Sequence, residues 1–225
     1  MATLTGAGDH AAPPARRRTE PRRPLQERGR ARYDALLNTL AAMLETQEPD
    51  AIGYYQLAEK AGIPPASMYH FFPSKGAAFL ALAERYLDVF RKGVRAPLDP
   101  ARTHGWQDVI RLRHRQSVAY YNANRPAMKL ILGAQPFLEV RAADRSADED
   151  ISGQILASID GMFELPPIEA APRKFLITLS IADAIWRIAY NTHGQITPDY
   201  QAEALDACLA YCRGFLPERL VKRAG

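Results

Sequence analysis

Residues 57–75 read LAEKAGIPPASMYHFFPSK, and this stretch predicts two short helices joined by a tight turn. Leu57 and Ala61 recur at the spacing of one helical face. Gly62 follows where a residue in the left-handed conformation would end that helix. Pro65 suits the first turn of the second helix, because proline is tolerated there.

On the second predicted helix, apolar side chains and polar side chains face in opposite directions. Met68 and Phe71 face inward, whereas Ser67, Tyr69 and His70 face outward. A helix-turn-helix presents its second helix to the major groove of DNA in this way. The alternative is that Tyr69 and His70 are ordinary surface or half-buried residues of a small helical bundle.

Residues 63–75 also resemble the recognition-helix signature of the tetracycline-repressor (TetR) family of bacterial regulators. From Met68 to Lys75, eight consecutive residues match the pattern aliphatic-Tyr-His-aromatic-Phe-Pro-Ser-Lys position by position. The resemblance covers roughly residues 26–90, and it implies an all-α protein of about nine helices. It further implies a three-helix helix-turn-helix head, followed by a larger helical domain for ligand binding and dimerisation.

The resemblance assigns contacts with DNA. Tyr69, His70 and Lys75 would position the duplex through its phosphates, and residues 65–67 would read the sequence. The candidate DNA-binding residues are Gly53, Tyr54, Tyr55, Pro65, Ala66, Ser67, Tyr69, His70 and Lys75.

The chain departs from the family pattern at two positions. Gly53 stands where the family often has a serine or threonine hydroxyl that meets a phosphate, so Tyr54 or Tyr55 could supply a hydroxyl instead. Pro64 replaces the usual small polar cap, which costs on the order of 1 kcal/mol of capping energy.

The basic residues are concentrated at one end of the chain. Residues 1–32 hold eight arginines against three acidic residues, a net charge of +5, whereas the whole chain carries +4. We expect residues 1–25 to form a disordered basic leader, because this Pro/Arg-rich segment has too little apolar surface to fold. The leader is either a solvated tail or an arm that adds phosphate or minor-groove contacts.

Composition limits the class of protein. Hydrophobic content of 47% and charged content of 24% are ordinary for a soluble globular chain. The longest apolar run, residues 175–190, is too short to span a membrane, and no secretory signal is present. Two cysteines give no disulfide framework, so a cytoplasmic protein without a membrane segment is expected.

The chain divides where proline and glycine become frequent, after Gly93. We assign residues 26–93 to a helix-turn-helix DNA-binding domain and residues 94–225 to a helical domain for effector binding and dimerisation. Within the second domain, residues 142–150 are densely charged and are expected to form a loop or frayed helix.

An apolar effector cavity in the second domain is the next prediction. Trp186 and Tyr190, one turn apart on one helical face, are the best pair. Each of these aromatic or methionine side chains could equally be plain core. The candidate ligand-binding residues are Trp106, His114, Tyr120, Tyr121, Met128, Phe137, Trp186 and Tyr190.

The last two long helices, near residues 173–191 and 198–215, are rich in alanine, which lets helices approach closely. In the family these helices form the homodimer interface. Cys208 and Cys212 share a face of the second helix. They could form a redox switch or half of a metal site, although small core or interface residues are the simpler interpretation.

No motif for catalysis is present outside a glycine pattern in the leader that lacks a preceding strand. We therefore expect no enzyme activity and no cofactor. The predicted function is a homodimeric repressor that binds a palindromic operator in double-stranded DNA and is released by a small hydrophobic or amphipathic effector. The alternatives are an activator or nucleoid-associated protein without an effector, or a helical adaptor whose second domain binds a protein partner.

Overall fold

A computed structural model describes residues 20–134 and 137–223 of the chain. Over these residues the chain forms nine α-helices and one short 3-10 helix, and the only β-type pairing there is one isolated bridge between Phe163 and Lys222. The predicted all-α class and helix number are confirmed. Most of the predicted leader, residues 1–19, lies outside the described residues.

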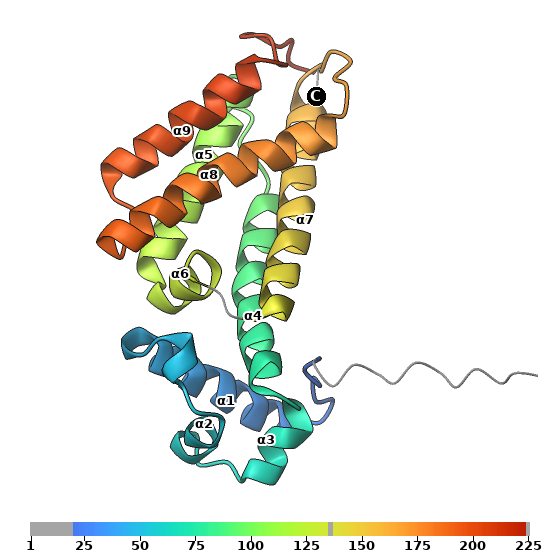
Figure 1. Ribbon diagram of the computed structural model, residues 1–225. Helices are drawn as coiled ribbons and strands as arrows, with labels where there is room; N and C mark the ends of the chain where they lie inside the picture. The colour runs from blue at the N-terminus through green and yellow to red at the C-terminus, as the bar shows by residue number, and fades with distance from the viewer. Residues whose placement is uncertain (1–19, 135–136, 224–225) are drawn as a thin grey trace, which may run out of the picture.

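The head of the molecule is a small bundle at one end (Figure 1). Its helix α1 begins before the apolar pattern that starts at Tyr33, because polar residues supply the first turns. Tyr33 meets Phe71 edge-on at 5.9 Å and lies 4.8 Å from Phe72 between ring centroids, so α1 and α3 share an aromatic core. The elements of the head are α1 (Glu27–Thr46), η1 (Pro49–Ala51), α2 (Tyr54–Lys60) and α3 (Pro65–Phe71).

The turn between α2 and α3 has the geometry that the sequence predicts. Gly62 adopts φ of +63°, a conformation that side chains rarely tolerate, and nothing crowds its α-carbon. After α3, the Ser74 hydroxyl accepts a hydrogen bond of 3.1 Å from the Ala77 amide and caps the next helix. The chain therefore enters α4 shortly after the end of α3.

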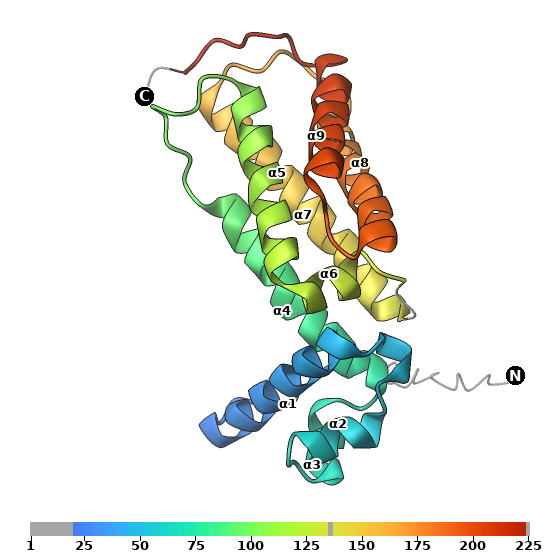
Figure 2. The same ribbon diagram turned by 90° about the vertical axis from the view of Figure 1, so that its left-hand side faces the viewer.

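Helix α4 (Lys75–Arg95) connects the head to the remaining helices, as Figure 2 shows. In the body, α7 packs between α4 and α8, and α9 packs on α8 and α5. Arg91 of α4 also pairs with Asp150 of α7 at 3.3 Å. The body helices are α5 (Trp106–Ala123), α6 (Arg125–Ile131), α7 (Leu138–Met162), α8 (Ala171–His193) and α9 (Pro198–Arg213).

Residues 142–150 are helical, so the prediction of a loop or frayed helix there was wrong. They lie inside α7, which runs without interruption for 25 residues. Val140 and Ala147 are buried at the spacing of one helical face, while most of the charged residues are exposed. Contact with α4 and α8 stabilises this segment, and local sequence does not reveal such contacts.

The residues just before α1 contact the head. The Arg22 amide donates a hydrogen bond of 2.8 Å to the Phe71 carbonyl at the end of α3. Arg23 pairs with Glu84 of α4 at 2.9 Å. This segment therefore contacts both the end of α3 and the middle of α4.

No helix in residues 20–134 or 137–223 is both long and apolar enough to cross a membrane.

Candidate nucleic-acid interface and ligand cavity

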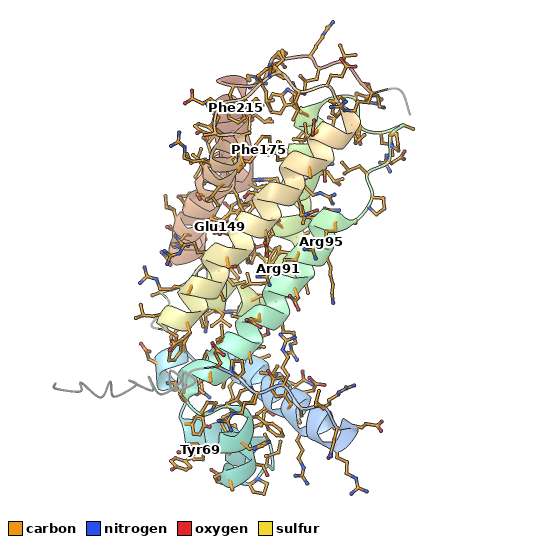
Figure 3. The ribbon with its side chains drawn as sticks, turned by 90° about the vertical axis from the view of Figure 1, so that its right-hand side faces the viewer. Tyr69, Arg91, Arg95, Glu149, Phe175 and Phe215 are labelled. Carbon is orange, nitrogen blue, oxygen red and sulfur yellow. The ribbon has the colours of Figure 1, made fainter. Side chains whose placement is uncertain are left out.

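Helix α3 exposes the face on which DNA contacts are predicted. Met68 and Phe71 are buried in the head, whereas Tyr69 is 44% exposed and His70 is also exposed. Figure 3 shows Tyr69 on the head, at the opposite end of the molecule from Phe175 and Phe215. Pro65 and Ala66 are exposed at the start of α3, and Ser67 is half-buried. The predicted readout positions therefore share one surface with Tyr69 and His70, with Ser67 at its margin.

Three tyrosines from α2 and α3 form a cluster beside this face. The Tyr55 and Tyr69 hydroxyls are 3.1 Å apart, and the Tyr54 and Tyr69 rings are 4.9 Å apart. The Tyr54 hydroxyl donates to the Phe72 carbonyl, and burial raises the pKa of Tyr54 to about 12. Because the Tyr54 hydroxyl is already hydrogen-bonded within the head, Tyr55 is the tyrosine of α2 whose hydroxyl can face a phosphate.

The start of α2 is capped without a side-chain hydroxyl. The Gly53 amide donates to the Gln56 side-chain oxygen at 3.2 Å, so the glutamine closes the first turn. No capping bond comes from the side chain of Pro64 at the start of α3. Both departures from the family pattern therefore leave the helix-turn-helix intact.

Lys75 has partners within the protein. Its ammonium donates to the Asp50 carbonyl at 3.0 Å and lies 5.8 Å from the centre of the Phe79 ring. Burial lowers the pKa of Lys75. Lys75 therefore connects η1 to the start of α4 by a hydrogen bond. The phosphate contact that the resemblance implies would be a second role for the same side chain.

The body holds a cavity of about 330 Å³ between α4, α5, α7, α8 and α9. His114, Tyr121 and Trp186, three of the predicted ligand-binding residues, line it together, as does Tyr120. The Trp186 ring lies 4.9 Å from His114 and 6.0 Å from Tyr121 between centroids. The sequence therefore identified one aromatic wall of the cavity.

Four predicted ligand-binding residues are not part of this wall. The Trp106 indole donates to the Pro217 carbonyl at 2.9 Å, and Met128 is buried in α6. Phe137 stacks on Phe79 near the head end of α4, with 4.7 Å between centroids. Tyr190 is half-buried and approaches Gly133. Helical spacing alone could not separate these residues from cavity residues, because both groups are apolar and inward-facing.

His114 is held as a neutral ring. Its Nε2 lies 2.8 Å from the Gln201 carbonyl, and because a carbonyl only accepts, Nε2 is the protonated nitrogen. Burial lowers the pKa of His114, although the bond to Gln201 acts in the opposite direction.

Polar residues that sequence reasoning missed also line the cavity. Arg113 donates to the Gly93 and Ala96 carbonyls at 2.7 and 2.8 Å, which fixes α5 to the end of α4. Asp144 and Asp148 from α7 and Asp183 from α8 lie on the cavity wall as well. A signal did exist, since Asp183 interrupts the longest apolar run of the chain.

The two cysteines are buried thiols. Cys208 donates to the Thr178 carbonyl at 3.2 Å, and the Cys212 sulfur lies 3.4 Å from the Thr178 hydroxyl. Burial raises the pKa of Cys208 to about 12 and also raises that of Cys212, which opposes thiolate chemistry. Within the described residues, no three His, Cys, Asp or Glu side chains group closely enough to hold a metal ion.

Known structures resemble most of this architecture. A TetR-family transcriptional regulator from Streptomyces coelicolor superimposes with a TM-score of 0.66 over 82% of this chain and 99% of that one, at 22% identity. The chain has the TetR-family fold. SmeT, the repressor of the Stenotrophomonas maltophilia multidrug efflux pump SmeDEF, shares this TetR fold with a TM-score of 0.61 at 15% identity, over 85% and 94% of the two chains.

Sequence similarity points in the same direction over a shorter span. The chain is 28% identical to the HTH-type transcriptional regulator RutR of Escherichia coli strain K12 over 127 residues, which is 56% of this chain and 60% of RutR. No protein-family model matches the chain. These similar proteins are transcriptional regulators and not enzymes, in agreement with the expectation from the sequence.

Proposed function

We propose that the chain is a DNA-binding transcriptional repressor whose helix α3 enters the major groove of an operator. The observation that carries this proposal is the outer face of α3, where exposed Tyr69 and His70 stand on a helix anchored by buried Met68 and Phe71. Tyr55 adds a hydroxyl beside Tyr69. In this arrangement the tyrosines, His70 and Lys75 position the duplex through phosphates.

Sequence readout falls to Pro65, Ala66 and Ser67 at the start of α3. Proline and alanine offer no side-chain hydrogen bonds, so readout depends on contacts with thymine methyl groups and on the shape of the DNA. Gly53 contributes backbone at the start of α2 rather than a hydroxyl.

The repressor acts as a homodimer through α8 and α9. Ile177, Ala184 and Ile188 of α8 are exposed at the spacing of one helical face, and Ala202 and Ala210 of α9 are exposed as well. An apolar helical face of this kind is suited to a four-helix interface between two subunits. Two heads would then meet half-sites about one helical turn of DNA apart, roughly 34 Å.

Release by an effector uses the cavity and α4. Leu87, Phe90 and Val94, on the C-terminal half of α4, line the cavity, while its first turn follows directly after α3. A ligand that shifts α4 therefore changes the spacing of the heads, with a coupling of about 1–3 kcal/mol. The proposal assigns residues 26–93 to DNA binding and 94–225 to effector binding and dimerisation, with α4 reaching across that boundary.

Selection of bound fragments from random DNA tests this function. We expect short inverted repeats to be enriched by the full-length protein, and Tyr69→Ala and His70→Ala to abolish that enrichment. Arg173→Ala, at the far end of α8, is the matched control and should leave the selected sequence unchanged. Uniform coating of DNA without a preferred sequence would indicate a nucleoid-associated protein and would contradict the proposal.

A further inference from the structure

The cavity joins an aromatic wall to a group of carboxylates. Its volume of about 330 Å³ is in the range of small-ligand sites. Trp186, Tyr121 and Phe90 supply apolar and aromatic surface to it. Asp144 and Asp148 are one turn apart on α7, and Asp183 is on the neighbouring helix α8. Most ligand cavities place few charges on such a wall, so three carboxylates are unusual.

The three carboxylates have neither a hydrogen-bond nor an ion-pair partner in the part of the chain that the structure describes. Within residues 20–134 and 137–223, no hydrogen bond or ion pair is formed by Asp144, Asp148 or Asp183. All three side chains are half-buried. Unpaired carboxylates on an apolar wall repel one another and lose hydration, both of which favour an added positive charge.

An unpaired donor on the same wall also indicates a ligand. Trp186 is 2% exposed and lines the cavity, and its Nε1 has no hydrogen-bond partner among the described residues. A buried indole N–H normally finds an acceptor. The aromatic faces of Trp186 and Tyr121 can in addition attract a cation.

The charges around the carboxylates leave an excess of negative charge. Arg187, one turn from Asp183 on α8, is the basic residue that opposes all three, and it forms no ion pair among the described residues. The guanidinium of Arg113 on α5 is occupied by the carbonyls at the end of α4. The ionisable residues that face the carboxylates or line the cavity are Arg113, His114, Tyr120, Tyr121, Glu149, Arg187 and Cys208.

We propose that the cavity binds an amphipathic organic cation, with its basic nitrogen attracted by the combined negative charge of Asp144, Asp148 and Asp183 and its apolar body against Trp186, Tyr121 and Phe90. This inference rests on the proposed role of the cavity as the effector site. A metal ion is the less suitable occupant, because no three potential ligands in the described residues come close enough together. An acceptor atom in the ligand body would satisfy the Trp186 indole.

The electrostatics of the three carboxyl groups support this choice. Burial raises the pKa of Asp144 to about 6, and burial together with repulsion from the other carboxylates raises the pKa of Asp148 and Asp183. A bound cation favours the ionised carboxylates, so its binding releases protons wherever they are protonated in the free protein.

Three small molecules with one skeleton and different charges test the proposal. The full-length protein, free of DNA, is titrated by calorimetry at pH 8 with 3-phenoxypropylamine, 3-phenoxypropan-1-ol and 3-phenoxypropanoate. We expect the amine to bind about tenfold or more tightly than the alcohol, and the carboxylate to bind most weakly. Equal or tighter binding of the alcohol or the carboxylate would overturn the proposal, as would the absence of binding by all three.

Charge removal locates the cation. In Asp148→Asn/Asp183→Asn we expect the preference for the amine over the alcohol to fall to about twofold or less. Asp160→Asn, on the same helix but outside the cavity, should retain the full preference. An undiminished preference in the double variant would place the cation elsewhere and refute the assignment.

The pH dependence provides a test on the unmodified protein. An alkylamine stays protonated from pH 6 to pH 8, because its pKa resembles that of lysine at about 10.4. We therefore expect the amine to bind more tightly at pH 8 than at pH 6, by about threefold or more, with net release of protons. An amine affinity that is constant or falls over this range would contradict the role of the carboxylates.

The outcomes separate this inference from the proposed function. A protein that prefers the amine but selects no DNA sequence would refute only the repressor proposal. A repressor released from its operator by the carboxylate and not by the amine would refute only the cation proposal.

Discussion

The outer face of α3 and the cavity wall illustrate two ways in which a sequence encodes a surface. The α3 face comes from seven consecutive residues, Pro65–Phe71, whose period separates buried from exposed side chains. The cavity wall takes residues from five helices, α4, α5, α7, α8 and α9. A contiguous site is readable from local spacing, whereas a dispersed one depends on how the helices pack.

The largest predicted effect is on the stability of the head, and it tests how far the α3 face depends on the aromatic residues buried beneath it. Phe72 is fully buried and touches the Tyr33 ring. We expect Phe72→Ala to lower the free energy of unfolding by about 3–5 kcal/mol, because it leaves a cavity in the head. Chemical denaturation measures this loss.

Leu138→Ala is the matched control for Phe72→Ala, since Leu138 is 73% exposed. It should change the free energy of unfolding by less than about 0.5 kcal/mol. A change in Phe72→Ala as small as that in Leu138→Ala would mean that the head does not depend on its aromatic core.

The next effect concerns the cavity carboxylates. Because their pKa values are raised in the folded protein, ionisation destabilises the fold, and stability from this source is lost as pH rises from about 4 to 8. We expect Asp148→Asn/Asp183→Asn to raise the free energy of unfolding at pH 8 by on the order of 1–3 kcal/mol. Denaturation curves between pH 4 and pH 8 should show this advantage shrinking as pH falls.

If the double variant were less stable than the natural protein at pH 8, this would contradict the conclusion that the ionised carboxylates destabilise the fold. Asp160→Asn serves as control, since Asp160 pairs with Arg223 on the surface and such pairs contribute about 1 kcal/mol or less.

A smaller effect tests the turn that precedes α3. Gly62 has φ of +63°, so Gly62→Ala should lower the free energy of unfolding by about 1–2 kcal/mol through backbone strain alone. Gly153→Ala, inside α7 with nothing within 4 Å of the added methyl group, should instead raise it by about 0.5–1 kcal/mol. Thermal unfolding of both variants gives the sign of each change in stability. Changes of the same sign would contradict the role of Gly62 in the turn.

The smallest effect on stability separates recognition from folding. Tyr69→Phe removes a hydroxyl whose one hydrogen-bond partner among the described residues is Tyr55 on the surface, so the free energy of unfolding should change by less than about 0.5 kcal/mol. We expect the free energy of operator binding to weaken by about 1 kcal/mol, measured by fluorescence anisotropy. Tyr200→Phe on α9 should leave binding unchanged, and equal losses in the two variants would contradict a direct role for Tyr69.

Local sequence predicted most of the fold. The apolar period found α1, and the positions of Gly62 and Ser74 found the turn and the cap of α4, because these features need only neighbouring residues. The prediction from local sequence was wrong for residues 142–150, where the density of charged residues suggested a loop or frayed helix. That same segment supplies Asp144 and Asp148 to the cavity wall, so one error hid both a helix and part of a site.

The sequence by itself determined the helix-turn-helix, the resemblance to TetR-family regulators and the buried and exposed faces of α3, since each is encoded within a few turns of chain. Only the tertiary structure decided that Trp186 shares a cavity with Asp144, Asp148 and Asp183, while Trp106 and Tyr190 do not. The physical reason is that the same periodicity places a residue inward in every helix, and the packing of five helices then determines which inward residues meet across a cavity.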